Sequence, residues 1–435
     1  MNITAIICEY NPFHNGHKYQ IEQIYKNKAT HVVAIMSGNF TQRGTPSIIS
    51  KYTKTEIALK NGCDLIIELP IPYSIANAEK FALGAVFLVN SLNCINFLSF
   101  GCENDDINIL KEAAQISSSY EVINLTKQFL KQGISFANAR CKAIKILFGE
   151  DLAKLLSTSN NILAVEYIKS LNRLDSKVAL MPVLRKSCLH SSNYNVGNFA
   201  NSTLLRKMLI NNEKISNFMP KSAYEILNRE VKKGFAPARI LNCERAFLAK
   251  LRCMRPADFL QIADVTEGME NKIYKSVQNS TSVKEVFAQI KSKRYTQARI
   301  QRILLSAFLD INKEIFNFLP QYIKVLGFNE KGKEILKIAK NKSTLPIVTK
   351  ISEIKKLENN HAAMTFLETE ARAFDLYNLM LPKVQMCGFE FTNQINLIIY
   401  FTIFQNIIKN LLCNFFKYRA TAFSSTFCIF SKNYY

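Results

Sequence analysis

Residues 3–19 read ITAIICEYNPFHNGHKY, an apolar run followed by a turn and a polar, histidine-containing segment. The run Ile3–Cys8 predicts a buried first strand, and Asn11-Pro12 predicts the turn after it. His14 then stands where a helix should begin, and His17 follows three positions later, so both imidazoles share one helical face. Gly16 between them leaves room for a nucleotide to lie against the backbone. Because helix N-termini carry free N–H groups and partial positive charge, this turn is suited to binding phosphate.

The segment His14-Asn15-Gly16-His17 matches the His-x-Gly-His motif of the adenylyl-transferring α/β superfamily, which includes class I tRNA synthetases and small nucleotidyltransferases. The alternative is a pair of surface histidines. The position directly after the first strand favours the functional interpretation, as does the presence here of two of the chain's five histidines. Such imidazoles donate hydrogen bonds to phosphate oxygens as charge builds during displacement at phosphorus.

The remaining pattern predicts an α/β fold. Apolar runs at His31–Met36, Leu65–Glu68 and Phe97–Phe100 alternate with amphipathic segments, which is typical of a parallel sheet with helices on both faces. From about Lys207 onward, long helical periodicities dominate. We therefore expect a Rossmann-like, parallel-sheet nucleotidyltransferase domain over 1–207, a mainly helical, basic domain over 208–392, and an atypical apolar tail over 393–435.

Composition narrows the class of protein. The 435 residues are 48% hydrophobic, enough for a real core, and 56 Lys and Arg against 34 Asp and Glu leave a formal charge of +22. That excess attracts polyanions such as nucleic acid, although a Lys-rich proteome would explain part of it. Eleven scattered cysteines without a Cys-x-x-Cys pair, and no signal peptide, predict reduced thiols in a cytoplasmic protein. Polar residues interrupt the apolar segment 395–416, so we expect no membrane partner.

Further candidates follow the other expected strands. Arg43 lies in a glycine-flanked loop after the second strand, at the edge where open α/β sheets bind ligands. The carboxylates of Asp64 and Glu68 are either structural or metal ligands. Gly101, after the fourth strand, permits close approach of a base. The segment 201–206 (NSTLLR) opens a helix with hydroxyls and an arginine, which suits a triphosphate.

Several of these motifs together resemble one family, the bacterial tRNA(Met) cytidine acetate ligases. The resemblance extends from residue 1 to about 392, and its motifs are 7–17, 36–44, 100–101, 160–163, 267–271 and 388–392. It implies that ATP activates acetate to acetyl-adenylate, and that the acetyl group passes to N4 of the wobble cytidine of elongator tRNA(Met). Two segments depart from the family pattern, Arg185-Lys186-Ser187-Cys188 and Asn201-Ser202.

The resemblance also implies an ATP site. Its residues are Ile7, Cys8, Glu9, Tyr10, Asn11, Pro12, Phe13, His14, Asn15, Gly16, His17, Lys18, Tyr19, Gln20, Gly101, Asn160 and Arg185. At the Asn160-Asn161 pair, Asn160 is the residue that aligns. In the first half-reaction an acetate oxygen attacks the α-phosphorus while pyrophosphate leaves, which needs positioning and charge neutralisation rather than a protein nucleophile. We expect His14, His17 and Arg43 to supply these. Mg²⁺ is expected on the phosphates, without a dedicated set of protein ligands.

A basic stretch in the second half predicts contact with tRNA. Its expected RNA-binding residues are Lys291, Lys293, Arg294, Arg299 and Arg302, with Tyr295 among them. The alternative for this stretch is a solvated helix face. Two other functions remain open from the residues alone: a small-molecule adenylyltransferase of the same superfamily, and a non-catalytic RNA-binding protein that keeps a nucleotide site. The sequence does not indicate the oligomeric state.

Overall fold

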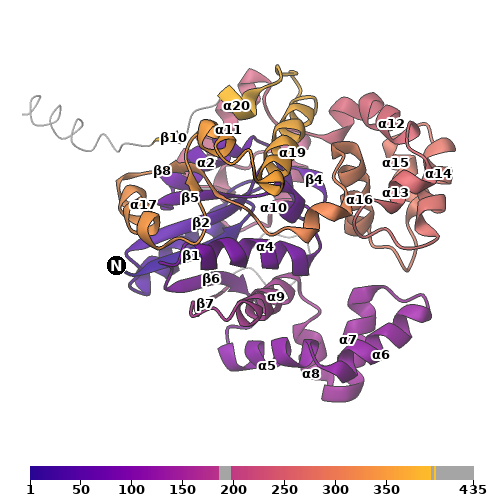
Figure 1. The fold of residues 1–435 in the computed structure, drawn as a ribbon, viewed down its shortest axis with the longest axis horizontal. Coiled ribbons are helices and arrows are strands. Elements are labelled where there is room, and N and C mark those ends of the chain that lie inside the picture. The colour runs from indigo at the N-terminus through magenta and orange to yellow at the C-terminus, as the bar shows by residue number, and fades with distance from the viewer. Residues whose placement is uncertain (186–196, 393–395, 398–435) are drawn as a thin grey trace, which may run out of the picture.

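The computed structural model describes residues 1–185, 197–392 and 396–397. One large sheet lies at its centre, with helices on both faces (Figure 1). The strands of this sheet are β1 (Ile3–Cys8), β2 (His31–Ser37), β5 (Leu65–Leu69), β6 (Phe97–Cys102), β7 (Ala179–Leu184), β8 (Ile323–Phe328), β9 (Ile347–Val348) and β10 (Asn396–Leu397). Two short strands, β3 (Phe40–Thr41) and β4 (Thr45–Pro46), form a separate hairpin.

The sheet order is β10-β8-β5-β2-β1-β6-β7, with β9 beside β8. Strand β1 is central and runs parallel to both β2 and β6, and the β2–β5 and β6–β7 pairs are parallel as well. Helices α1 (Asn15–Lys26), α2 (Lys51–Lys60), α4 (Ala78–Ser91) and α9 (Ser159–Arg173) connect or cover these strands. The expected α/β class and its four N-terminal strands are confirmed.

Strand β8 differs from the expectation because it comes from the region predicted to be mainly helical. It pairs antiparallel with β5, so the second half contributes to the same sheet instead of standing apart from it after residue 207. A short apolar run between long helices gives little local signal. Its strand character follows from the free edge of β5.

The remaining helices form the surroundings of the sheet and two lateral groups (Figure 1). The group inserted between β6 and α9 consists of α5 (Ile107–Ser117), α6 (Tyr120–Lys131), α7 (Phe136–Phe148) and α8 (Glu150–Leu155). The second group consists of α12 (Glu244–Arg252), α13 (Pro256–Leu260), α14 (Met269–Gln278), α15 (Val283–Ile290) and α16 (Gln297–Leu309). Around the sheet lie α3 (Ile71–Ser74), α10 (Ser202–Ile210), α11 (Lys221–Lys233), α17 (Glu330–Lys342), α18 (Ile351–Lys355), α19 (His361–Asn378) and α20 (Phe389–Thr392).

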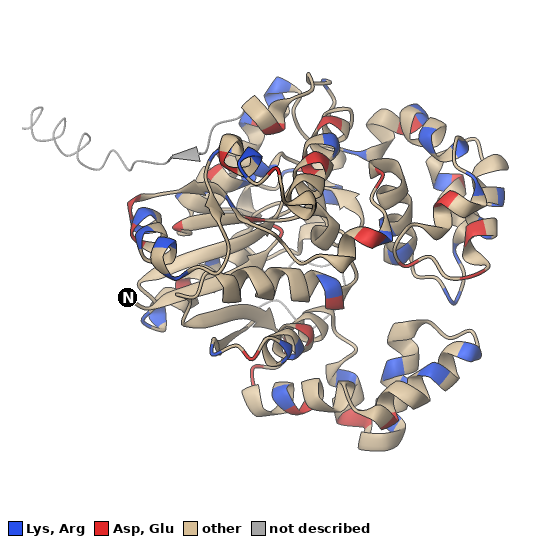
Figure 2. Cartoon of the chain, in the orientation of Figure 1, with Lys and Arg blue, Asp and Glu red and all other residues tan. Residues whose placement is uncertain are grey.

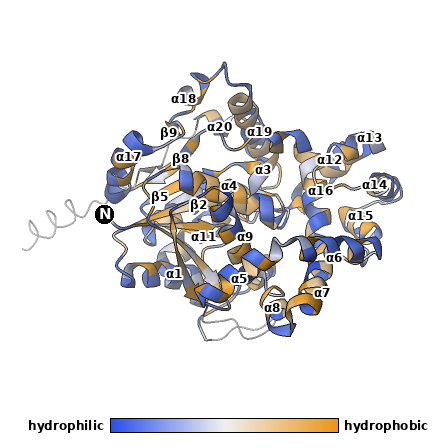
Figure 3. Cartoon of the chain, turned by 60° about the horizontal axis from the view of Figure 1, so that its bottom comes forward, coloured by the Kyte–Doolittle hydropathy of each residue, from blue (hydrophilic) through white to orange (hydrophobic). Residues whose placement is uncertain are grey.

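The core lies on both faces of the sheet. Every residue of β2 and β5 is buried, which is the near-continuous apolar pattern of a parallel sheet covered on two sides. In Figure 3 the central strands are mainly hydrophobic, whereas the surrounding helices carry both polar and apolar residues. Helix α11, for example, buries Ala223, Ile226 and Leu227 and exposes charged residues on its other side.

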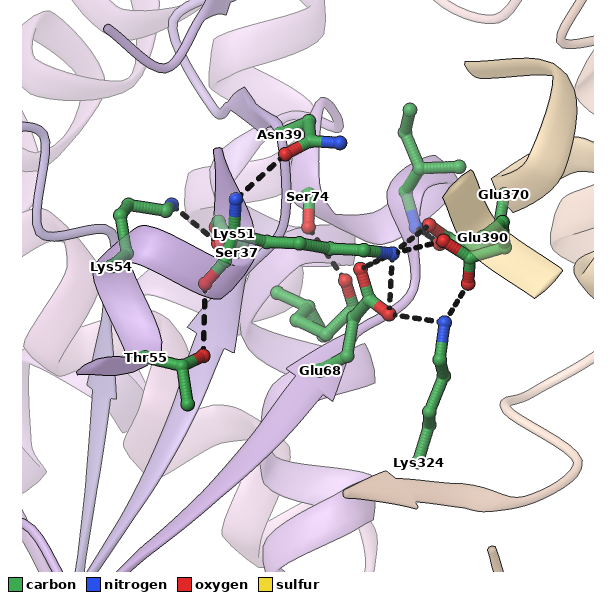
Figure 4. A network of polar contacts seen from close by, with 12 residues as sticks. Ser37, Asn39, Lys51, Lys54, Thr55, Glu68, Ser74, Lys324, Glu370 and Glu390 are labelled. Atoms are coloured by element: carbon green, nitrogen blue, oxygen red, sulfur yellow. Dashed lines mark hydrogen bonds and ion pairs between the residues drawn. The ribbon is translucent and has the colours of Figure 1, made fainter. Parts of the chain in front are cut away.

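A buried ionic network joins the sheet to the C-terminal helices (Figure 4). The Lys51 ammonium lies 2.7 Å from Glu68 Oε1 and 2.7 Å from Glu390 Oε2, and 3.8 Å from Glu370. Lys324 of β8 contacts Glu68 and Glu390 from the other side. Burial by itself would raise the pKa of Glu68, but Lys324 and Lys51 outweigh it and lower that pKa. The network holds α2, β5, β8, α19 and α20 together.

The two carboxylates whose role was open from the sequence are both structural. Glu68 belongs to the ionic network, and Asp64 Oδ2 accepts hydrogen bonds from the Val32 N–H and the Tyr25 hydroxyl. Asp64 Oδ1 accepts from Asn329. Within the described residues, no group of three or more histidines, cysteines or carboxylates has a metal-binding arrangement.

Candidate active site

A cavity of about 780 Å³ opens at the carboxyl ends of β1 and β6, where the N-termini of α1, α9 and α10 converge. The predicted residues that line it are Ile7, Cys8, Glu9, Tyr10, Asn11, His14, His17, Gln20, Arg43, Gly101, Asn160 and Arg185. Gly16 and Tyr19 line an adjoining smaller pocket. The structure thus brings together residues from five separate parts of the chain.

The other residues of the predicted ATP site do not line the main cavity or the smaller pocket. Phe13 is buried in the core, Lys18 donates a hydrogen bond to the Asn61 carbonyl, and Asn15 donates to the carbonyls of Asn198 and Asn217. Pro12 belongs to the turn and is not among the residues that line either pocket. Lys186, Ser187 and Cys188, where the chain departs from the family pattern, lie outside the described residues.

His14 and His17 are fixed by hydrogen bonds of the turn itself. His14 is the N-cap of α1, and its Nδ1 accepts from the Gly16 N–H at 3.1 Å. The Nδ1 of His17 accepts from the His14 N–H at 3.2 Å, and the two rings stack with their centroids 3.7 Å apart. Because each Nδ1 accepts, each neutral ring carries its proton on Nε2 and can donate from there.

Burial, with Arg185 and Arg206 nearby, lowers the pKa of His14 to about 3. Burial and the neighbouring His14 likewise hold the pKa of His17 well below its ordinary value. Both rings are therefore neutral hydrogen-bond donors at neutral pH.

The pKa shift of His14 predicts a measurable loss of stability in acid. The unfolded chain binds a proton at His14 below about pH 6.5, whereas the folded chain does so only near pH 3. Between these values the unfolded state holds more protons, so stability falls as pH falls, by about 1.4 kcal/mol per pH unit. We expect His14→Asn, which keeps an N-cap acceptor, to remove this contribution when urea unfolding is measured from pH 6.5 to 4.5. An identical pH dependence in the variant would contradict the burial of a neutral His14.

Besides Arg185, two arginines from other parts of the chain lie on the cavity wall. Arg43 lies in the turn between β3 and β4, and Arg206 on α10 donates to the Asn11 carbonyl at 2.7 Å. Gly44 ends the Arg43 turn with φ of 72°, and a Cβ there would lie 2.4 Å from the backbone nitrogen of Arg302. Only glycine fits both requirements. The Arg43 turn is therefore packed directly against α16.

Asn160 and Asn161 have different environments. Asn160 lines the cavity, accepts from Arg185 Nη1 at 3.2 Å and donates to Glu103 Oε1 at 2.5 Å. Asn161 is buried, and its Oδ1 accepts from the backbone N–H groups of Glu103 and Asn104. Asn160 is therefore the member of the pair on the wall, and Glu103 orients it.

Sequence reasoning missed several residues of the wall. Glu103 follows β6 with no sequence pattern that marks it, and Phe81 and Tyr167 are indistinguishable from core positions of α4 and α9. Arg206 was noted only as a phosphate candidate at the start of a helix. The signal for all four is their place in the fold, since they meet only when α4, α9 and α10 pack at the same sheet edge.

The basic stretch does not lie on one helix. Residues 291–296 connect α15 to α16, and Lys291, Lys293 and Arg294 are exposed there. Arg299 and Arg302 lie on α16 and are bound to Asp264, through its carbonyl and its carboxylate respectively. Figure 2 shows positions of basic residues along the α12–α16 group interspersed with positions of acidic ones.

The fold and the histidine pair define a nucleotidyl transferase, and the family model described as "HIGH Nucleotidyl Transferase" matches residues 1–390. The chain is 41% identical over 400 residues to the tRNA(Met) cytidine acetate ligase of Thermoanaerobacter sp. (strain X514), covering 90% of this chain and 98% of that protein. The ligase of Caldanaerobacter subterraneus subsp. tengcongensis is 40% identical over 91% of this chain and 99% of its own length. A crystal structure of Thermotoga maritima TmcAL bound with alpha-thio ATP superposes with a TM-score of 0.86 at 32% identity, covering 92% of this chain and all of that one. The chain therefore belongs to the tRNA(Met) cytidine acetate ligase family.

None of the helices in the described part of the chain is both long and apolar enough to cross a membrane. Apart from 396–397, the tail 393–435 lies outside the described residues.

Proposed function

We propose that this chain is an ATP-dependent ligase that converts acetate to acetyl-adenylate and transfers the acetyl group to N4 of the wobble cytidine of elongator tRNA(Met). The observation that carries the proposal is the pair of neutral, Nε2-protonated histidines at the start of α1, facing a nucleotide-sized cavity. The names of the relatives and the ATP-analogue complex of the Thermotoga protein support the same reaction.

The residues of the cavity fit ATP. The N-termini of α1 and α10 converge on it and suit the phosphates, and Arg43, Arg185 and Arg206 supply positive charge. Gly101 leaves open the strand end beside Arg185, where a base can approach the backbone. Mg²⁺, when bound, would neutralise charge on the phosphates, and its remaining ligands would be water.

In the first half-reaction an acetate oxygen attacks the α-phosphorus and pyrophosphate leaves. The Nε2–H groups of His14 and His17 are positioned to donate to phosphate oxygens as negative charge develops on them. Because both rings are already neutral and fixed by the turn, no proton transfer or reorganisation is needed at that moment. Arg43 is placed to act on the same cavity from the β3–β4 turn.

The deciding experiment measures both half-reactions with the purified full chain. We expect ATP–pyrophosphate exchange that depends on acetate, and labelled acetate incorporated into total tRNA as N4-acetylcytidine after nuclease digestion. ATP–pyrophosphate exchange that is independent of acetate but requires a phosphorylated vitamin precursor would favour the small-molecule adenylyltransferase. No exchange at all would favour the non-catalytic RNA-binding protein.

We also propose that the exposed residues of the α15–α16 connection contact tRNA. Reversing the charge of Lys291, Lys293 and Arg294 to Glu is expected to weaken tRNA binding and to leave acetate-dependent exchange unchanged. Each lost phosphate contact should lower the slope of log affinity against log salt by about one unit. Filter binding at several salt concentrations measures this.

The matched control for that experiment is charge reversal of three exposed lysines on α17, Lys333, Lys337 and Lys340. These change the net charge equally but lie on the opposite side of the molecule (Figure 1). Arg299 and Arg302 are excluded from the variant because their contacts with Asp264 make them structural. Equal losses in the two variants would indicate a nonspecific effect of net charge and contradict the proposed surface.

A further inference from the structure

Glu9 is a cavity-lining carboxylate whose hydrogen bonds are incomplete. It directly follows β1 beside the histidine turn, and its Oε1 accepts from the Gln42 N–H at 2.6 Å. Among the hydrogen bonds of the described residues, none involves its Oε2. The main chain at this point is held by Lys54, which donates to the Glu9 carbonyl at 2.9 Å. One carboxylate oxygen is thus anchored while the other keeps its capacity to accept a proton.

The other titratable groups of the cavity are less suited to accepting a proton. Each histidine already uses Nδ1 as an acceptor and carries hydrogen on Nε2. Both oxygens of Glu103 are bound, one to the Asn160 amide and one to the Asn161 N–H. Burial raises the pKa of Tyr10 well above its ordinary value, so this phenol stays protonated. Among the described residues of the wall, Glu9 is the remaining candidate base.

The surroundings of Glu9 favour this role. Burial raises its pKa, while the Gln42 N–H, Lys54, Arg206 and Arg43 limit the rise. A carboxylate with a raised pKa is a stronger base than one in water, provided that it remains ionised. The neighbouring acidic groups are the Cys8 thiol at the end of β1 and the Tyr167 hydroxyl on α9, and burial raises the pKa of both, so neither adds a negative charge.

We propose that Glu9 recognises the amino group of the acceptor cytosine and accepts its proton during acetyl transfer; this assignment rests on the proposed function. The bond from N4 to the acetyl carbon forms, and the bond from that carbon to the phosphate oxygen of AMP breaks, its electron pair leaving with AMP. N4 loses one proton to the free oxygen of Glu9, which later returns it to water. A carboxylate that accepts from N4 also distinguishes cytosine from uracil, which has only a carbonyl oxygen at that position.

The same cavity offers a surface for the base. Phe81, Phe100 and Tyr167 line it, and the rings of Phe100 and Tyr167 lie 6.1 Å apart. Enzymes that act on a base extrude it from its stack and hold it against aromatic or apolar side chains. These rings would orient a cytosine whose amino group reaches Glu9.

The test separates the two half-reactions in Glu9→Gln. Acetyl-adenylate formation is followed as acetyl-hydroxamate in the presence of hydroxylamine, and transfer is followed in a single turnover with transcribed tRNA(Met). Glutamine keeps an acceptor for the Gln42 N–H but is not a base, so transfer should fall about 10²–10⁴-fold more than adenylate formation. Glu9→Asp, which keeps a carboxylate, should retain more transfer than Glu9→Gln. The control is Glu22→Gln on the exposed side of α1, which removes one carboxylate away from the cavity.

The outcomes are distinct. Transfer by Glu9→Gln within about threefold of the wild type, or an equal fall in both half-reactions, would overturn the assignment while the proposed function stands. Equal transfer by the Asp and Gln variants would overturn it too. A wild-type chain that forms no acetyl-hydroxamate from ATP and acetate, or acetylates no tRNA, would overturn the proposed function and the assignment together. Filter binding of tRNA to Glu9→Gln at wild-type affinity would confirm that the lost step is chemical.

Discussion

His14→Ala and His17→Ala are each expected to reduce acetate-dependent ATP–pyrophosphate exchange by about 10²–10³-fold, the usual effect of removing one preorganised hydrogen-bond donor from a developing negative charge. The reason is geometric. Each ring is held by a backbone N–H on its Nδ1, so that its Nε2–H is available to the phosphates. The stacking of the two rings at 3.7 Å means that loss of one also frees the other to move.

Two control variants distinguish a loss of catalysis from a loss of folded protein. His14→Asn preserves an N-cap acceptor for α1 and removes only the ring, so its activity should fall as far as that of His14→Ala while its stability falls less. His361→Ala changes an exposed histidine on α19 and should exchange at the wild-type rate. Exchange within about threefold of wild type in either His14 variant would remove His14 from the site.

The second large effect concerns stability. Lys51→Met would leave Glu68, Glu390 and Glu370 facing Lys324 alone, at positions that are 2%, 0% and 7% exposed. Removing one partner of a buried ion pair typically costs about 3–5 kcal/mol, because the charge left without that partner cannot reach water. We expect about this loss in the free energy of unfolding, measured by urea titration at pH 7.

A double-mutant cycle and a pair of truncations refine that measurement. Combining Lys51→Met with Glu390→Gln should lower the free energy of unfolding by less than the sum of the single changes, because the second change removes a charge that the first leaves unpaired.

A chain ending after Leu397 keeps Glu390 and β10 and should be as stable as the full chain. A chain ending after Gly388 loses Glu390 and should be destabilised in the same manner as Lys51→Met. A loss below about 1 kcal/mol for Lys51→Met would contradict the network.

Much of the site was readable from the first seventeen residues because the interactions that build it are local. An apolar run, a turn and two histidines three positions apart specify a strand, a helix start and a shared helical face within one short segment. The same logic recovered the strands Ile3–Cys8, His31–Ser37, Leu65–Leu69 and Phe97–Cys102, and placed Arg43 and Gly101 at strand ends. Parallel strands end at one sheet edge, so strand order alone brings such residues together.

Contacts between residues that lie far apart in the chain could not be predicted from these local patterns. Lys51 pairs with Glu390, Glu103 orients Asn160, and Arg299 is bound to the Asp264 carbonyl, all through packing that no local pattern encodes. The same holds for β8, whose apolar run becomes a strand of the N-terminal sheet only because β5 offers it a free edge. The preference of a segment for helix, strand or turn depends on a few neighbouring residues, so it can be predicted from the sequence. The choice between a metal-binding and a structural role for Glu68, or between RNA contact and an internal hydrogen bond for Arg299, depends on which side chains the packed elements bring within about 3 Å.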